Sequence, residues 1–262
     1  RRRHQTAPLQ VVVDASDSMS AGSAISAAQM LGMVKGQEAM IRRGKSPLTV
    51  YDVRLRAWYN PDFVAPFYMV PGTLGIILTM TMIMITSAAL VREREQGTME
   101  QLVVTPVRPL ELMLGKILPY VIVGYVQLSL GLAVGMGLFD VPVRGSLGLL
   151  YLLTLPFIVA NLFLGILISG VARTQMQAAQ MSFFTLLPSI LLSGYVFPRE
   201  AMPEIFFQFS RILPLTYFLR IIRGIMLKGA GWNALGENVL ALGVLIGIFA
   251  TVSLLTFRRQ EA

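Results

Sequence analysis

Five apolar blocks, each long enough to cross a lipid bilayer, occupy most of the chain after residue 69. They lie at about 71–91, 117–139, 147–170, 179–197 and 236–257. About 20 residues of α-helix cross a hydrocarbon core of about 30 Å, and every block is close to that length. Because lipid offers the backbone no hydrogen-bond partners, the blocks must satisfy their own bonds as helices. The sequence therefore predicts an α-helical polytopic membrane protein with five visible spans.

The composition of the chain supports this fold class. Of its 262 residues, 55% are hydrophobic and only 14% are charged, whereas soluble domains carry about 25% charged residues. The net charge is +8, but the basic residues lie mostly in loops between the apolar blocks. No basic stripe with interleaved aromatic residues exists, which argues against nucleic-acid binding. The chain has no cysteine, so disulfide and thiol chemistry are excluded.

Residues 1–68 are more polar and predict a small α/β domain. A β-like run at 10–14, a helix-compatible stretch at 20–43 and an alternating stretch at 49–58 form a β-α-β pattern. Such a short segment builds only a thin core, so we expect further elements of the same domain upstream. The chain opens with "RRRHQTAPLQ", without Met or a signal-peptide run. We expect a chain cut at its N-terminus.

The segment "VVVDASDSMS" at 11–20 contains Asp14, Ser16 and Ser18 in a D-x-S-x-S pattern. The metal-binding loop of von Willebrand A-type adhesion domains begins in a similar way, and hard oxygen ligands of this kind suit Mg²⁺. Such a domain takes well over 68 residues, however, and draws further ligands from later loops. The metal site is therefore the less favoured interpretation.

A simpler interpretation of this segment is a strand that runs into a turn and a helix. Asp14 would end the strand, and Asp17 with Ser18 would make the turn. Ser20 or Ser23 would then cap the helix that follows.

Several absences in the sequence exclude classes of function. The single histidine is His4, so no histidine-based triad or zinc site can form. Gly115 and Lys116 are followed by Ile117, which does not match a nucleotide-binding P-loop. The predicted spans carry no Asp, Glu, Lys or Arg at their centres, where ion-coupled carriers usually place them. The chain cannot hydrolyse ATP by itself, so if it moves a substrate, the energy comes from elsewhere.

The loop after the first block reads "VREREQGTMEQLVVTPVRPLELMLGK". Gly97 breaks the first helix, and Thr98 stands three residues before a glutamine, with Glu100 between them, as in a capping box. The pattern predicts a short helix at 99–104 that lies across the membrane face, and Pro109 starts the next helix. The alternative is an ordinary solvated connector.

Several separated motifs carry a family resemblance. This loop, with "VPG" at 70–72, "LLSGYVFPREAMP" at 191–203 and "LPLTYFLRIIRGIMLKG" at 213–229, resembles the membrane subunit of type-2 ABC exporters. The similarity is greatest to their bacterial drug and ion efflux permeases, and it extends to "VVVDASDS" and "RAWYNP". It implies a non-catalytic, multi-pass permease of the bacterial inner membrane, without a cofactor of its own, because a partner ATPase binds ATP and Mg²⁺.

In that family an E-x-E-x-G-T loop is the cytoplasmic element that docks on the ATPase subunit. The resemblance transfers this role to Glu93, Glu95, Gly97 and Thr98, and Glu100 adds a further charge. The coupling loop would then cover residues 92–110. The resemblance also places residues 1–68 outside the cytoplasm. The family has six spans, so we expect the first helix to be missing from this chain.

The segment 198–229 is divided into short amphipathic pieces by three prolines, Pro198, Pro203 and Pro214. The pieces cover about 203–212 and 215–228. The second carries Arg220 and Arg223 and is too short to span. We expect both to lie in the membrane interface, with aromatic side chains at headgroup level: Phe206, Phe207, Phe209, Tyr217 and Phe218. The family resemblance implies re-entrant or interfacial helices at the outer mouth, and the alternative is an interfacial loop without a gating role.

The partners expected from this assignment are an ABC ATPase subunit, a second copy of the chain or a paralogous permease, and membrane lipid. A periplasmic adaptor is a further candidate, and no nucleic acid is expected. An apolar path without charge favours amphiphilic drugs or lipids over small ions as cargo. The alternative function is a membrane-anchored ligand-binding or sensor protein that takes a metal at Asp14, Ser16 and Ser18.

The Gly131-x-x-x-Gly135 spacing is common by chance in apolar helices, and no role is assigned to it.

Overall fold

The computed structural model describes residues 8–16, 18–43, 52–97 and 109–261. The chain divides into two compact units, Arg1–Tyr68 and Met69–Ala262. We call them the N-terminal unit and the helical unit and describe each by itself.

The N-terminal unit is a β-α-β element, as the sequence predicts. Strands β1 (Pro8–Asp14) and β2 (Asp52–Trp58) pair in parallel, and helix α1 (Ser18–Arg43) connects them. Parallel neighbours cannot be joined by a tight hairpin, so a crossover of this kind is required. Both strands contact α1.

The turn after β1 agrees with the strand-and-turn interpretation, but it lies at Ala15 and Ser16. The prediction that Ser18 belongs to the turn is wrong, because Ser18 begins α1, and Asp17 lies outside the described residues. The Asp14 carboxylate accepts a hydrogen bond from the backbone N–H of Ser16 at 3.0 Å, an Asx turn. Helix α1 already begins at Ser18, so Ser20 and Ser23 lie inside it, and the prediction that one of them caps it is wrong. Among the described residues no group of three His, Cys, Asp or Glu side chains is placed to hold a metal ion.

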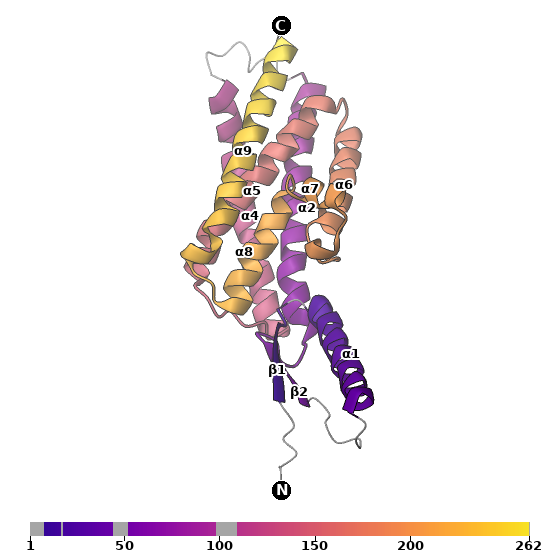
Figure 1. Ribbon diagram of the computed structural model, residues 1–262. Coiled ribbons are helices and arrows are strands. Elements are labelled where there is room, and N and C mark those ends of the chain that lie inside the picture. Colours follow the sequence, from indigo (N-terminus) through magenta and orange to yellow (C-terminus); the bar gives the residue numbers. More distant parts are fainter. Residues whose placement is uncertain (1–7, 17, 44–51, 98–108, 262) are drawn as a thin grey trace. The chain divides into compact units, whose positions relative to one another are not determined.

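The helical unit is a group of helices built around α5 (Figure 1). The elements are α2 (Ala65–Glu95), α4 (Pro109–Leu138), α5 (Leu147–Val171), α6 (Gln175–Leu192), the 3₁₀ turn η1 (Arg199–Ala201), α7 (Glu204–Ser210), α8 (Pro214–Lys228) and α9 (Trp232–Glu261). Helix α5 packs against α4, α6, α8 and α9. The predicted helix start at Pro109 is confirmed.

Four helices of the described residues are long and apolar enough to cross a membrane. They are α2, Ile117–Leu138 of α4, α5, and Trp232–Thr256 of α9. They correspond to the predicted spans at 71–91, 117–139, 147–170 and 236–257. A fifth span exists if α7 and α8, which are bent by 78° relative to each other, together count as one.

The predicted span at 179–197 is the one that differs. The structure has an 18-residue helix there, Gln175–Leu192. This helix is not among those that are long and apolar enough to cross a membrane. Its start is fixed by Thr174, whose hydroxyl caps the helix by accepting from the N–H of Gln177 at 3.2 Å. After its end, Gly194 has a φ of 90°, which glycine adopts without strain. Hydropathy alone had placed the helix too far along the chain.

Helices α2 and α4 approach closely at the Gly131-x-x-x-Gly135 stripe. A Cβ atom at Gly131 would overlap the side chain of Leu74, and one at Gly135 would lie 2.7 Å from Val70. Small residues permit such close packing between membrane helices. The stripe therefore has a packing role that sequence reasoning did not assign to it.

Helices α2 and α5 also approach closely at Gly165. A Cβ atom there would lie 2.9 Å from the backbone carbonyl oxygen of Ile83 and 2.9 Å from the Cβ of Thr86. Because backbone atoms are part of this contact, a side-chain rotation cannot relieve it. Nearby buried residues form a hydrophobic core cluster: Met82, Leu90, Ile117, Ile158, Leu162, Phe163, Ile166, Leu245 and Phe249.

Helix α8 is packed inside the helical unit, which corrects its predicted place in the interface. Phe218 is fully buried, and its ring stacks on Phe157 with centroids 3.9 Å apart. The prediction that Phe218 lies at headgroup level is wrong. An amphipathic pattern does not distinguish a helix that faces lipid headgroups from one that packs on neighbouring helices, here α5 and α9. Phe206 and Phe209 of α7 remain 50% and 56% exposed.

Candidate coupling site

The last turn of α2 carries alternating charges, and the helix ends directly after it. The N–H of Gln96 donates to the carbonyl of Arg92 at 3.0 Å, and the N–H of Gly97 donates to the carbonyl of Arg94 at 3.2 Å. Gly97 then has a φ of 69°, the left-handed conformation that ends many helices. The predicted break at Gly97 is confirmed.

Arg94 caps the end of α5. One terminal nitrogen of its guanidinium donates to the carbonyl oxygens of Ser169 at 3.1 Å and Ala172 at 3.4 Å. The last carbonyls of a helix have no partner within the helix, and they form its partly negative end. A cation from α2 therefore stabilises the C-terminal turn of α5.

Glu95 caps the start of α6. Its carboxylate accepts from the backbone N–H of Gln175 at 3.0 Å and also from the side-chain amide of the same residue. The amide oxygen of Gln175 accepts in turn from Nε of Arg92 at 3.3 Å. The first N–H groups of a helix lack partners within it and form its partly positive end, where an anion is stabilising.

One turn of α2 thus caps two neighbouring helices with opposite charges. We call this set the Glu95 cluster, and its members are Arg92, Arg94, Glu95, Ser169, Ala172 and Gln175. The cluster joins α2 to the connection between α5 and α6.

The structure places only part of the predicted coupling set. Glu95 is turned toward α6, Gly97 ends α2, and Glu93 is half-buried. Thr98 and Glu100, with the predicted helix at 99–104, lie outside the described residues. Sequence reasoning did not find the three partners on α5 and α6. A capping box at Thr174 and Gln177 was a visible signal for the start of α6.

The other end of α2 contacts the turn after α6. The ring of Tyr195 lies where a Cβ atom at Gly72 would be, and its hydroxyl is 3.1 Å from the hydroxyl of Thr73. Arg223 of α8 donates to the carbonyl of Gly194 at 3.2 Å. Tyr195 and Arg223 therefore connect α2, α6 and α8 at this end.

The three prolines of the 198–229 segment stand where its short elements begin. Pro198 precedes η1, and Pro203 precedes α7. Pro214 is the first residue of α8, where its missing N–H costs nothing. The predicted division of the segment is confirmed, whereas its gating role stays a prediction.

A buried arginine holds the first part of this segment together. Arg199 is only 6% exposed, its Nε donates to the Ser210 hydroxyl at 2.9 Å, and its guanidinium lies 4.8 Å from the ring centre of Phe207. The guanidinium of Arg211 lies 5.1 Å from the same ring. Burial, and next the charge of the exposed Arg220, lower the pKa of the Arg199 guanidinium. The segment therefore concentrates positive charge around one aromatic ring.

Comparison with known proteins gives the family. A family model described as "ABC-2 family transporter protein" matches residues 3–255. "Probable multidrug ABC transporter permease YbhR" of Escherichia coli strain K12 is 34% identical over 98% of this chain and 69% of its own length. "Inner membrane transport permease YhhJ" of the same strain is 33% identical over 96% of this chain and 67% of its own length.

A more distant relative is "ABC transporter G family member 20" of Dictyostelium discoideum. It is 31% identical over 172 residues, which are 66% of this chain and 24% of that protein. The family match covers both units, and the sequence carries no nucleotide-binding loop. The chain therefore belongs to the ABC-2 transporter family, as a multi-pass inner-membrane permease: the non-catalytic transmembrane subunit of an ABC exporter, which dimerises and works with a separate ATPase subunit.

Proposed function

We propose that residues 92–110 dock on the ATPase subunit and that α2 transmits its movement to the 198–229 segment. The observation that supports this most is the set of contacts along α2. This single helix of 31 residues is about 46 Å long at 1.5 Å per residue. Its two ends bond to different parts of the permease, at Gln175 and at Tyr195.

Residues in and beside the Glu95 cluster have two different roles: some bond to other helices of the permease, and others would face the ATPase. Glu95 is a positioning residue, because its carboxylate is bonded to Gln175 of α6. Glu93 and Glu100 would offer charge to a basic surface of the ATPase, and Gly97 sets the direction in which the chain leaves α2. The capping pattern of the sequence assigns Thr98 to the start of the predicted helix at 99–104. A push on this loop acts on α5 and α6 as well as α2.

At the other end, we assign the outer gate to the bent pair α7 and α8. The gate residues are Pro198, Pro203, Pro214, Arg220 and Arg223. Arg223 contacts the turn that also holds Tyr195, so a shift of α2 at Thr73 reaches the gate through a short chain of contacts. In this orientation residues 1–68 are extracytoplasmic and residues 92–110 are cytoplasmic.

The cargo and the remaining partners follow from the same assignment. YbhR is named as a probable multidrug permease, and the four helices long enough to span carry no charge at their centres, which favours amphiphilic drugs. The dimer partner is a second copy or a paralogous permease, surrounded by membrane lipid. A periplasmic adaptor would engage residues 1–68. ATP and Mg²⁺ are bound by the ATPase.

Glu93→Ala is expected to abolish export and ATPase stimulation while the protein still inserts. Removing a charge from a desolvated contact costs about 2–5 kcal/mol of docking free energy. Gly97→Val should act in the same way, because valine tolerates a φ of 69° poorly. The measurements are co-purification of the ATPase and export rate in inverted vesicles.

Glu111→Ala serves as the matched control, because Glu111 is a carboxylate just beyond the proposed loop. The Glu111→Ala variant should co-purify with the ATPase subunit and export at the wild-type rate. Wild-type retention of the ATPase and wild-type export in the Glu93 variant would show that this loop is a connector without a docking role.

A further inference from the structure

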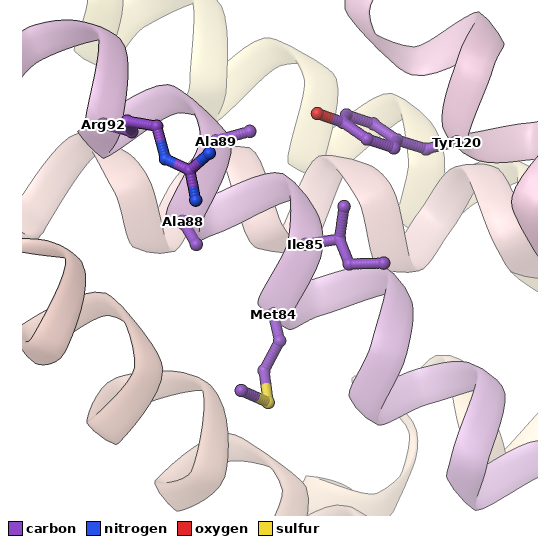
Figure 2. Close-up of a pocket in the computed structure, with 6 residues that line it drawn as sticks. All are labelled: Met84, Ile85, Ala88, Ala89, Arg92 and Tyr120. Atoms are coloured by element: carbon purple, nitrogen blue, oxygen red, sulfur yellow. The ribbon is translucent and has the colours of Figure 1, made fainter.

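A groove on α2 lies directly beside the Glu95 cluster. Its volume is about 330 Å³, and α2 contributes one stripe of its lining: Met84, Ile85, Ala88, Ala89 and Arg92. Tyr120 of α4 completes the lining (Figure 2). The α2 residues recur about every four positions and so share one helix face. The two alanines in the middle leave the space that the groove occupies.

The groove combines an apolar wall with two hydrogen-bond donors. The Arg92 guanidinium carries five N–H donors, and Nε donates to Gln175 at 3.3 Å. No other hydrogen bond joins this guanidinium to the part of the chain that the structure describes, and the same holds for the Tyr120 hydroxyl. In Figure 2 this hydroxyl is directed toward the side of α2 that carries Ala89. The Glu95 carboxylate acts electrostatically on Arg92, and the Glu93 carboxylate acts on Tyr120, but the N–H and O–H donors that remain on the two groups can still serve a ligand.

The chemistry of these donors defines the ligand. A guanidinium pairs with a carboxylate or phosphate through two parallel hydrogen bonds, and it repels a cation. Pockets for small ligands are mostly apolar, with few polar groups and volumes from about 300 Å³ upward. We propose that this groove binds an acidic amphiphile. Arg92 would pair with its carboxylate or phosphate, Tyr120 would donate a further bond, and Met84 and Ile85 would cover its apolar body.

Arg92 belongs to both the groove and the Glu95 cluster, since its Nε bonds to Gln175 at the start of α6. A ligand on Arg92 therefore acts on the residue that joins α2 to α6. This link to export rests on the proposed function, whereas binding in the groove does not. Two sources share the chemistry: an exported acidic amphiphile and a resident anionic phospholipid.

The test uses the complete permease–ATPase complex in nanodiscs of zwitterionic lipid. The probes are a spin-labelled fatty acid and its methyl ester, which differ only in the anionic group. The wild type should bind the acid about tenfold or more tightly than the ester, as expected for a charged hydrogen bond. Arg92→Gln should reduce acid binding to the level of the ester. Tyr120→Phe, which keeps the ring, should weaken acid binding severalfold.

Two further variants separate the groove from general effects. Ala88→Phe should fill the groove and reduce binding of both probes. Arg173→Gln is the matched control, because Arg173 is an exposed arginine in the neighbouring turn and does not line the groove. It should bind both probes as the wild type does. Equal affinity of the wild type for acid and ester, or unchanged acid binding in Arg92→Gln, would overturn the proposal.

The two sources are distinguished in inverted vesicles supplied with ATP. Accumulation of the acid in the lumen identifies an exported substrate. Displacement of the acid by phosphatidylglycerol, without accumulation, identifies a resident lipid. The Glu93→Ala variant separates this proposal from the coupling role, because it should lose export and bind the acid at least as tightly as the wild type, since it removes a negative charge that acts on Tyr120.

Discussion

Gly165→Leu is expected to leave little folded permease and no measurable export. A Cβ atom at this position already meets the Ile83 carbonyl oxygen at 2.9 Å, and leucine adds three more carbon atoms. Because the backbone carbonyl of Ile83 cannot rotate away as a side chain could, α2 and α5 must move apart. Overpacking a core costs about 1–3 kcal/mol even where side chains can rearrange. The measurements are size-exclusion profile, thermal unfolding midpoint in detergent and export rate.

The control for this substitution is Gly243→Leu on α9. Gly243 is exposed, and no heavy atom lies within 4 Å of a Cβ built on it, so leucine should be tolerated there and improve helix propensity. Gly165→Ala should give an intermediate loss of stability. A Gly165→Leu protein that unfolds at the wild-type temperature would contradict the close contact between α2 and α5.

Glu95→Lys is expected to lower export more than tenfold while the ATPase still co-purifies. The substitution removes both hydrogen bonds to Gln175 and puts a cation at the partly positive start of α6. It also adds a third cation to the turn that carries Arg92 and Arg94. ATP hydrolysis should continue without export, because the loop would dock but no longer move α6. Parallel assays of ATPase retention, hydrolysis and export measure this uncoupling.

A double-mutant comparison decides whether Glu95 acts through α6 or through the ATPase. If Glu95 positions α6, Gln175→Ala should reproduce part of the loss seen in Glu95→Ala, because the backbone N–H of residue 175 still donates to Glu95. The double variant should then be no worse than Glu95→Ala alone. If Glu95 contacts the ATPase instead, the two losses should add and Glu95→Ala should release the ATPase. That second result would refute the positioning role.

The spans could be predicted because hydropathy measures how strongly a segment avoids water. A segment in lipid and a segment in the protein interior share this property. The same property explains the failure at 179–197. The first turns of α6 contain Gln175, Gln177 and Gln180, which lower its hydropathy and move the apolar window toward Phe197. The capping pattern at Thr174 is a local signal for the observed start, and the prediction from hydropathy did not use it.

The missed contacts all join residues far apart in sequence. Glu95 and Gln175 are 80 positions apart, and each looks like an ordinary polar residue near a helix end. The Gly131-x-x-x-Gly135 spacing acquires meaning only when Leu74 and Val70 are found opposite it. Phe218 fits an interface or a core equally well until Phe157 is seen to stack on it. Local patterns give helices and their ends, and a single sequence does not give their partners.

The Glu95 cluster also bears on how this protein is made. Because 80 residues separate Glu95 from Gln175, α2 leaves the ribosome about 4–16 s before the start of α6, at about 5–20 residues per second. The charged turn of α2 is therefore already at the membrane surface when the connection between α5 and α6 emerges. Arg94 and Glu95 can bond to that connection as soon as it is synthesised. A circular permutant that translates α2 last would reverse this order and leave both helix ends uncapped during insertion.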